Sequence, residues 1–270
     1  MIRNLSELYQ YRALLFALSV RELRARYRAS VLGFLWTFLN PTLSMFVYWL
    51  VFQVMMVRGA GGPKAFPYFI FCGLLPWLFF SSSLLGGTTS VSDRKDLLTK
   101  VRFPAQVLPA TVVLTNLINL VLSIPLLLGL GLVFDITPSW HLVFLIPVLL
   151  VQTFFTLAVT YLLAALNVAF RDLQHIVASV VQLAFFLTPV LWPIGQVPSL
   201  FGLTPEESRQ LVGIVNPMAP MVASWQDIFY AQQVPTDWQG IGVVAVESLI
   251  IMLISSAVFE RRREEFAELV

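Results

Sequence analysis

Few side chains in this sequence could carry out acid–base or metal chemistry. Charged residues make up 12% of the 270 residues, and histidine occurs only twice. His141 and His175 border different apolar segments, so we do not expect them to share a metal ion. The chain also lacks G-x-x-x-x-G-K-[ST], the motif whose backbone N–H groups hold ATP phosphates. We therefore predict no catalytic residue, metal ion or cofactor in this chain, and no ATP hydrolysis by it alone.

Glu247 is the one acidic residue that falls clearly inside an apolar run. A carboxylate in lipid is costly, so such a residue is by default a candidate for proton transport. A proton relay usually needs several ionisable groups, and we favour a structural hydrogen bond within a helix bundle. Neutral polar residues in or near apolar runs could join helices in the same way or line a polar path, and we favour the first role. These are Asn116, Asn119, Asn167 and Gln182.

Aromatic side chains are the other candidates for contact with a substrate. They could pack against neighbouring helices or present flat faces to a sugar chain or lipid, and residue type alone leaves both interpretations open. The aromatic candidates are Trp36, Tyr48, Phe185, Phe186 and Trp192. Asn40-Pro41 adds a polar group and a residue that removes a helical hydrogen bond, so it is a candidate point of flexing.

The elements that position these residues are predicted to be membrane-spanning helices. Apolar residues make up 58% of the chain and the mean hydropathy is +0.81, whereas soluble domains have about 25% charged residues. The first apolar run is about 40 Å long as a helix, enough for a core of about 30 Å. We predict a single all-α polytopic domain with six transmembrane helices, over residues 31–57, 66–91, 105–133, 141–169, 173–195 and 239–259.

Residues 1–30 are expected to form an amphipathic helix lying on the membrane. Asn4 and Glu7 match a capping box, and apolar residues then recur at helical spacing. The later turns are basic, which suits an anionic membrane surface. The alternative is a helical flank that only stops translocation. The apolar residues are Leu8, Tyr11, Leu15 and Leu18, and the basic ones are Arg21, Arg24, Arg26 and Arg28.

The distribution of basic residues predicts the orientation. Segments 1–30, 92–104, 170–172 and 260–270 contain 14 of the 17 Lys and Arg residues. Because cytoplasmic loops carry an excess of Lys and Arg, both termini are expected in the cytoplasm.

Two connections are candidates for more than a loop. On the cytoplasmic side, 92–104 predicts a short charged helix that either docks into a partner or is an ordinary solvated loop. Its charged and apolar positions include Asp93, Arg94, Lys95, Asp96, Leu97 and Lys100. On the outer side, 196–238 predicts a helix at about 205–214, opened by Thr204-Pro205, and an interfacial or re-entrant helix. The apolar stripe of that second helix includes Met218, Met221, Trp225 and Phe229, and we favour a lid over simple packing.

Five blocks of the sequence resemble, in the same order, the membrane subunits of type-2 ABC exporters that move polysaccharides. The blocks are RELRARYRASVLGFLWTFLNP, KVRFPAQVLP, NVAFRDLQHI, TPVLWPIGQVP and NPMAPMV. Within that family the sequence is most similar to permeases for lipid-linked O-antigen, teichoic acid and capsular polysaccharide. The resemblance implies export across the bacterial cytoplasmic membrane by a homodimer, with a pore between its two copies.

The resemblance also implies roles for particular segments. Two separately encoded ATPase subunits would bind ATP-Mg and contact the N-terminal helix and a coupling helix in 92–104. Residues 196–238 would form outer gate helices, and the aromatic residues named above would line the path. Arg171 and Asp172, in the turn before 173–195, would support coupling by pairing with each other or with the basic helix.

Three alternatives remain at this level. A type-2 ABC exporter of drugs or small lipids would show the same architecture. A proton-coupled secondary transporter would depend on Glu247 and need no ATPase. A membrane-embedded glycosyltransferase would need an acidic cluster on a loop, which the sequence lacks.

Overall fold

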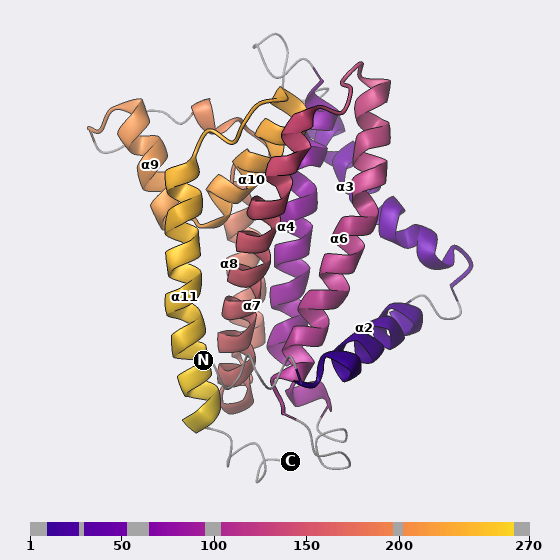
Figure 1. Ribbon diagram of the computed structural model, residues 1–270, viewed down its shortest axis with the longest axis vertical. Helices are drawn as coiled ribbons and strands as arrows, with labels where there is room; N and C mark the ends of the chain where they lie inside the picture. The colour runs from indigo at the N-terminus through magenta and orange to yellow at the C-terminus, as the bar shows by residue number, and fades with distance from the viewer. Residues whose placement is uncertain (1–9, 27–29, 53–64, 95–103, 197–201, 262–270) are drawn as a thin grey trace.

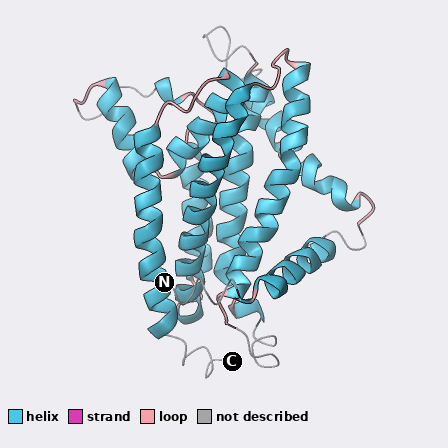
Figure 2. Cartoon of the chain, viewed as in Figure 1, coloured by secondary structure: helices cyan, strands magenta, loops and turns pink. Residues whose placement is uncertain are grey.

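The computed structural model describes residues 10–26, 30–52, 65–94, 104–196 and 202–261, and within these ranges the chain is helical with no strand (Figure 2). The main helices are α2 (Arg12–Arg26), α3 (Trp36–Trp49), α4 (Phe66–Thr89), α6 (Val107–Val133), α7 (Leu145–Ala169), α8 (Leu173–Leu187), α9 (Pro205–Val215), α10 (Met218–Gln226) and α11 (Trp238–Arg261). Of these, α4, α6, α7, α8 and α11 run side by side in a bundle, with α2 lying obliquely beside its lower end and α9 beside its upper end (Figure 1). Shorter helical turns are η1 (Gly33–Leu35), η3 (Ser92–Arg94), η4 (Trp140–Phe144), η5 (Ile194–Gln196) and η6 (Asp227–Ala231).

Five segments of the described chain are long and apolar enough to cross a membrane, which makes this a polytopic membrane protein. They are Gly33–Phe52, Phe66–Thr89, Val107–Val133, Trp140–Ala169 and Trp238–Arg261. The predicted spans 66–91, 105–133, 141–169 and 239–259 are confirmed to within two residues at each end. The predicted first span, 31–57, is confirmed as far as Phe52, and its last residues lie outside the described ranges.

The predicted fifth span, 173–195, is wrong in length. Its helix, α8, has 15 residues and ends at Leu187. Thr188 is extended, with ψ 141°, because the ring of Pro189 excludes the helical conformation at the residue before it. A helix of this length rises about 22 Å, less than the bilayer core of about 30 Å. The remaining residues turn back through η5 instead of continuing the helix.

The central element is α4, which contacts α3, α6, α7, α8 and α10. Of its most apolar 18-residue window, 72% is buried, against 17% for the first span. A helix that is apolar all round is usually buried in a protein core or spans a membrane, and α4 does both. These five helices are therefore arranged around α4, while α2 packs on α6 and α11 packs on α7. Of the five, α3 keeps a largely exposed apolar face.

Small residues allow the helices to approach closely. Gly87 of α4 lies against Thr160 of α7, and a Cβ added at Gly87 would overlap the Thr160 methyl group. Between α7 and α11 the buried residues include Ala158, Ala165 and Ser248. Tight packing through small side chains is the usual basis of helix association in membranes, where lipid is as apolar as the helices.

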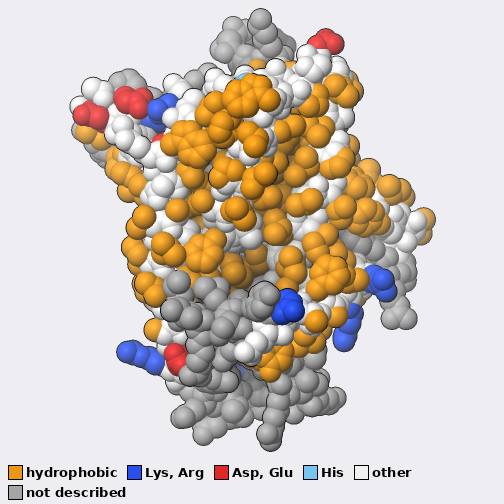
Figure 3. Space-filling model, in the orientation of Figure 1, with side chains coloured by type: hydrophobic (Ala, Val, Ile, Leu, Met, Phe, Trp, Pro, Cys, Tyr) orange, Lys and Arg blue, Asp and Glu red, His pale blue; other side chains and the backbone are white. Residues whose placement is uncertain are grey.

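The two ends of the bundle differ in charge. On the face shown in Figure 3, an apolar belt separates the ends, and most visible Lys and Arg side chains lie at the lower end. In Figure 1 that end holds α2 and the last turn of α11, while α9 lies at the opposite end. Because α9 carries the exposed acids Glu206 and Glu207, the protein has one basic end and one end without a basic excess.

We predict that Gly87→Ala lowers stability by about 1–3 kcal/mol, because an extra methyl group in a packed core forces side chains or backbone to shift. The double variant Gly87→Ala/Thr160→Ser should recover most of the loss, since serine lacks the overlapping methyl group. Thermal unfolding of the purified protein in detergent would measure both effects.

Gly129→Ala is the matched control, because nothing lies within 4 Å of a Cβ at that position. Equal melting temperatures for Gly87→Ala and Gly129→Ala would contradict the close approach of α4 and α7.

Candidate functional site

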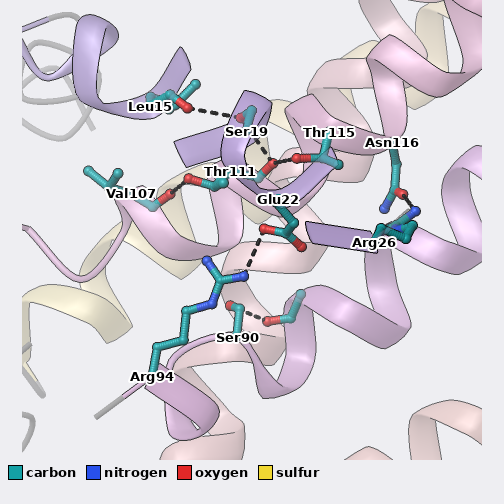
Figure 4. Close-up of polar contacts among 11 residues, drawn as sticks. Leu15, Ser19, Glu22, Arg26, Ser90, Arg94, Val107, Thr111, Thr115 and Asn116 are labelled. Atoms are coloured by element: carbon teal, nitrogen blue, oxygen red, sulfur yellow. Dashed lines mark hydrogen bonds and ion pairs between the residues drawn. The ribbon is translucent and has the colours of Figure 1, made fainter. Parts of the chain in front are cut away.

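The basic N-terminal helix α2 is fixed to the membrane helix α6. Ser19 of α2 is fully buried, and its hydroxyl group is shared between the carbonyl oxygens of Leu15 (2.9 Å) and Thr111 (3.4 Å). Further along α2, Nη1 of Arg26 donates to Oδ1 of Asn116 at 3.4 Å (Figure 4). Thus α2 contacts α6 through polar groups at two heights, and a displacement of α2 would act directly on a membrane span.

An ion pair joins α2 to the end of α4. Arg94 in η3 donates from Nη2 to Oε2 of Glu22 at 2.8 Å, and these side chains are 28% and 19% exposed (Figure 4). Between α4 and η3, the hydroxyl group of Ser90 caps the end of α4: its Oγ donates to the carbonyl oxygen of Gly87 at 2.7 Å. Because a pair with this exposure contributes only about 0–1 kcal/mol to stability, its main effect is to position the two elements.

A third helix meets the same junction. Nδ2 of Asn167, near the end of α7, donates to Oγ of Ser92 at 3.3 Å. The junction of α2, η3, α6 and α7 thus gathers four chain segments at the basic end of the bundle. Two of the polar residues expected to join helices, Asn116 and Asn167, do so here.

The structure describes only some of the residues that were predicted to lie at this end. Arg21 and Arg24 are exposed on α2, and Tyr11, Leu15 and Leu18 are half-buried. Asp93 is exposed beside Arg94. The other predicted positions lie outside the described residues: Asn4, Glu7, Leu8, Arg28, Lys95, Asp96, Leu97 and Lys100.

Arg171 and Asp172, predicted to form a cytoplasmic turn, are both exposed between α7 and α8. No ion pair joins them to each other or to another residue in the described ranges, so the expected pairing is not observed there. Asp172 instead starts α8, and its carbonyl oxygen accepts from the backbone of His175 at 3.0 Å.

A polar pocket of about 450 Å³ lies between α2, α3, α4 and α6. It brings together four predicted residues: Arg26, Trp36, Asn40 and Pro41. The other lining residues are Thr37, Leu75, Leu78, Phe79, Ser82, Asn116, Asn119, Leu120 and Ser123. The helix α3 continues through Pro41 without a break, and Thr42 donates its hydroxyl to Phe38 O at 2.7 Å, one turn back.

A second group of predicted residues is aromatic and shares no residue with this pocket. Tyr48 of α3 stacks on Phe185 of α8, with ring centroids 5.1 Å apart, and Phe185 also contacts Phe186. Trp192 donates from Nε1 to Phe186 O at 3.4 Å. Trp77 of α4 contacts Phe185 at 5.7 Å. The prediction missed Trp77, although an aromatic residue in mid-span was an available signal.

The predicted outer helix is inserted deep into the bundle. Every residue of α10 is buried, including Met218, Met221 and Trp225, and Phe229 in the following π-helical turn is buried as well. The re-entrant interpretation therefore fits α10 better than the interfacial one.

Two glutamine side chains hold α10 in place. Gln152 of α7 accepts from Trp225 Nε1 at 3.1 Å and donates to the Pro76 carbonyl of α4 at 3.0 Å. Gln226 donates to the Pro189 carbonyl at 2.8 Å. Gln152 is fully buried in an apolar helix and was not predicted, although a lone amide within an apolar run is a signal for such a bond.

The second outer helix, α9, begins with the predicted residues. Thr204 and Glu207 form a complete capping box, followed by Pro205 in the first turn. The backbone N–H and hydroxyl of Thr204 donate to the Glu207 carboxylate, and this lowers the pKa of Glu207. The capping box is therefore kept at neutral pH and is lost when the pH falls through that lowered pKa.

Glu247 lies on α11 and lines a pocket of about 560 Å³ between α9 and α11. Its Oε2 atom is buried and has no hydrogen-bond partner in the described ranges, so the structural hydrogen bond expected for it is not observed at that oxygen. Gln182 is exposed on α8. The described residues contain no group of three His, Cys, Asp or Glu side chains that could hold a metal ion.

We predict that Gln152→Leu destabilises the protein by about 1–3 kcal/mol, because the buried Trp225 N–H loses its acceptor. Gln182→Leu is the control, since it makes the same replacement at an exposed position of a neighbouring helix. Unfolding temperatures in detergent would compare the two. If Gln152→Leu melted no lower than Gln182→Leu, α10 would not depend on this amide.

Comparison with known proteins agrees with this architecture. Residues 13–205 match the family model described as ABC-2 type transporter. The chain is 53% identical over 268 residues to the O-antigen export system permease protein RfbA of Myxococcus xanthus, covering 99% of both proteins. It is 28% identical to RfbA of Klebsiella pneumoniae, covering 95% of both. The Polysialic acid transport protein KpsM of Escherichia coli is 24% identical over 68% of this chain and 72% of its own length.

These matches cover most of the described helices, from α2 through α8, and the first relative covers almost the whole chain. The helical bundle, the absence of an ATP-binding motif and the matches agree with one another. The chain therefore belongs to the ABC-2 type transporter family, as a multi-pass membrane permease subunit.

Proposed function

We propose that this permease moves a lipid-linked polysaccharide of the O-antigen type across the bacterial cytoplasmic membrane. The observation that carries the proposal is the 53% identity to an O-antigen export permease over 99% of both chains. The more distant relatives are also named for polysaccharides, O-antigen and polysialic acid. This favours polysaccharide over the drug and small-lipid alternative, and membership of the ABC-2 family goes against a proton-coupled transporter.

The basic end of the bundle faces the cytoplasm in this proposal. Segments 1–30, 92–104, 170–172 and 260–270 hold 14 of the 17 Lys and Arg residues, and such an excess marks cytoplasmic segments. The whole chain, 1–270, then forms one transmembrane domain. Residues 1–30 lie at the cytoplasmic surface, 31–195 and 239–259 contain the spans, 196–238 is the outer gate segment, and 260–270 is a cytoplasmic tail.

Its partners are a second copy of this chain and two separate ATPase subunits that bind ATP-Mg. An ABC exporter requires ATP hydrolysis, and this chain lacks the phosphate-binding motif. The ATPase contact is assigned to η3, with the rest of 92–104, and to α2. The large exposed apolar surface of α3 and α8, which includes Phe46, Phe186 and Leu187, suits contact with lipid or the second copy.

The contacts of the junction support a route for coupling. Closure of the ATPase subunits displaces η3 and α2 together, because the Arg94–Glu22 pair joins them. The displacement reaches α4 directly through the chain and α6 through Ser19 and Arg26. The first span and α8 then separate at the Tyr48–Phe185 contact and open a path. On the outer side, the gate segment 196–238 contains both α9 and α10. Because α9 packs on α10 and α11 while α10 is buried among α4 and α7, a movement of α9 disturbs less packing.

Deleting the gene in its host would test the proposed function. We expect surface polysaccharide to disappear and the lipid-linked polymer to accumulate on the cytoplasmic side, with both effects reversed when the permease gene is returned to a host that keeps its ATPase. Normal surface polysaccharide after deletion, with new sensitivity to drugs, would favour the drug exporter instead.

The Arg94–Glu22 pair should be needed for coupling more than for folding. Glu22→Arg and Arg94→Glu each place like charges opposite one another, so we expect several-fold lower export, with melting temperatures changed little because the pair is worth about 0–1 kcal/mol. The swapped double variant restores the attraction and should recover export. A double variant as defective as the single ones would show that the pair is not the link.

Pro41 should matter for movement of the first span. Replacing it by alanine adds a backbone hydrogen bond and stiffens α3, so we expect Pro41→Ala to reduce export at normal expression. Pro125→Ala is the control, because Pro125 also lies inside a helix, α6, but outside the polar pocket. Unchanged export by Pro41→Ala would remove Asn40-Pro41 as a flexing point.

A further inference from the structure

The polar pocket between α2, α3, α4 and α6 combines one cation with neutral polar groups. Among the described residues that line it, Arg26 is the only charged one and none is acidic. Amide and hydroxyl groups come from Asn40, Ser82 and Asn119, among others. A pocket with this composition favours a ligand that carries negative charge and several hydrogen-bonding oxygens.

Arg26 keeps most of its hydrogen-bonding capacity for such a ligand. A guanidinium group has five N–H donors, and the only bond seen for Arg26 in the described ranges is the long one, 3.4 Å, from Nη1 to Asn116. The side chain is exposed at the rim of the pocket. Arginine binds phosphate through paired N–H donors, and such charge-assisted bonds are about twice as strong as neutral ones.

Asn119 indicates a second property of the ligand, a hydrogen-bond donor. In the present rotamer its Oδ1 is shielded from the pocket and has no hydrogen-bond partner among the described residues, although the half-buried residue lines the pocket. A buried acceptor without a donor is costly. Turning the side chain toward the pocket gives Oδ1 access to a ligand; because this oxygen can only accept, the ligand must donate, as a hydroxyl group does, and phosphate oxygens without protons cannot serve.

The pocket also has an apolar side that a lipid chain could follow. Leu75, Leu78, Phe79 and Leu120 line it. Its α3 wall belongs to the least buried of the spans, whose apolar residues Leu43 and Val47 are about half exposed. An amphipathic ligand can therefore place its headgroup beside Arg26 and its chain along exposed apolar surface.

We propose that this pocket binds the headgroup of a phosphate-bearing lipid with a hydroxylated group next to the phosphate. Arg26 contacts the phosphate, and Asn119 accepts a hydrogen bond from a neighbouring hydroxyl. Two sources share this chemistry: phosphatidylglycerol of the bilayer, and a polyprenyl phosphate that carries a sugar. Only the second source rests on the proposed export function.

Native mass spectrometry of the purified permease, without ATPase or ATP, would measure lipid binding from detergent micelles. The probes are phosphatidylglycerol, phosphatidylethanol, phosphatidylcholine, a sugar-linked undecaprenyl phosphate and inorganic phosphate. We expect phosphatidylglycerol to bind at least about tenfold more tightly than phosphatidylcholine. Phosphatidylethanol has the same charge but no hydroxyl, and should bind less tightly than phosphatidylglycerol.

Variants separate a lipid site from a structural contact between α2 and α6. Arg26→Gln keeps amide donors for Asn116 but loses the charge, so the tenfold preference should disappear, whereas Arg26→Lys should keep it. Arg24→Gln removes the same charge from the same helix outside the pocket and should keep it too. Asn119→Leu should abolish the preference for phosphatidylglycerol over phosphatidylethanol without changing the preference over phosphatidylcholine.

The two sources are told apart by direct competition. Tighter binding of the sugar-linked undecaprenyl phosphate assigns the pocket to the exported lipid, and equal or weaker binding assigns it to a bilayer lipid. An Arg26→Gln variant that matches Arg24→Gln would overturn the proposal, as would binding of inorganic phosphate with no lipid retained. Because binding is measured without transport, its failure leaves the export proposal standing, and a failure of export leaves the pocket standing.

Discussion

Burial of α4 is the constraint on which the other elements depend. Within a bilayer, polar groups must find partners inside the protein because lipid offers none. Around α4 these partners come from separate helices: Gln152 bonds to the Pro76 carbonyl, and Asn116 donates to Ser83 at 3.3 Å. Gly87 lets α7 approach at the basic end, and the chain then enters η3. One helix thus connects the junction at the basic end with the buried helix α10.

The contrast between α4 and its neighbours explains where movement is feasible. Packed cores deform little, because any void loses contacts on one side. By comparison, α3 and α8 expose apolar faces and meet through few side chains, chiefly Tyr48 and Phe185. Opening that contact disturbs far less packing than moving α4 relative to α7. This distribution of burial is the reason for proposing that the path opens beside α3 and α8.

The membrane spans were predictable because a long apolar run in a sequence is rarely anything other than a membrane-spanning helix. The end of α8 was predicted wrongly, because the apolar run continues past Leu187 and the Thr188–Pro189 step that ends the helix, a signal present in the sequence, was passed over. The stripe of Met218, Met221 and Trp225 predicted a helix correctly, but its depth depends on Gln152 and Gln226, which lie far apart in sequence.

Prediction from the sequence reached the same limit at the polar pocket: it found the residues but not their arrangement. Arg26, Trp36 and Asn40 could be singled out by type and position, and Asn119 by its place in an apolar run. That these residues line one pocket follows from the docking of α2 on α6, which no local pattern encodes. A local pattern can also mislead: the adjacent charges of Arg171 and Asp172 suggested an ion pair that the described structure does not contain.

The central claim is that this chain moves a lipid-linked saccharide only when a separate ATPase drives it through the basic end. Purified permease in liposomes, with and without the ATPase, would test this by following a fluorescent polyprenyl-linked saccharide from one leaflet to the other. The account predicts movement that requires both the ATPase and hydrolysable ATP. Movement by the permease alone, driven by a pH gradient and abolished by Glu247→Gln, would contradict it.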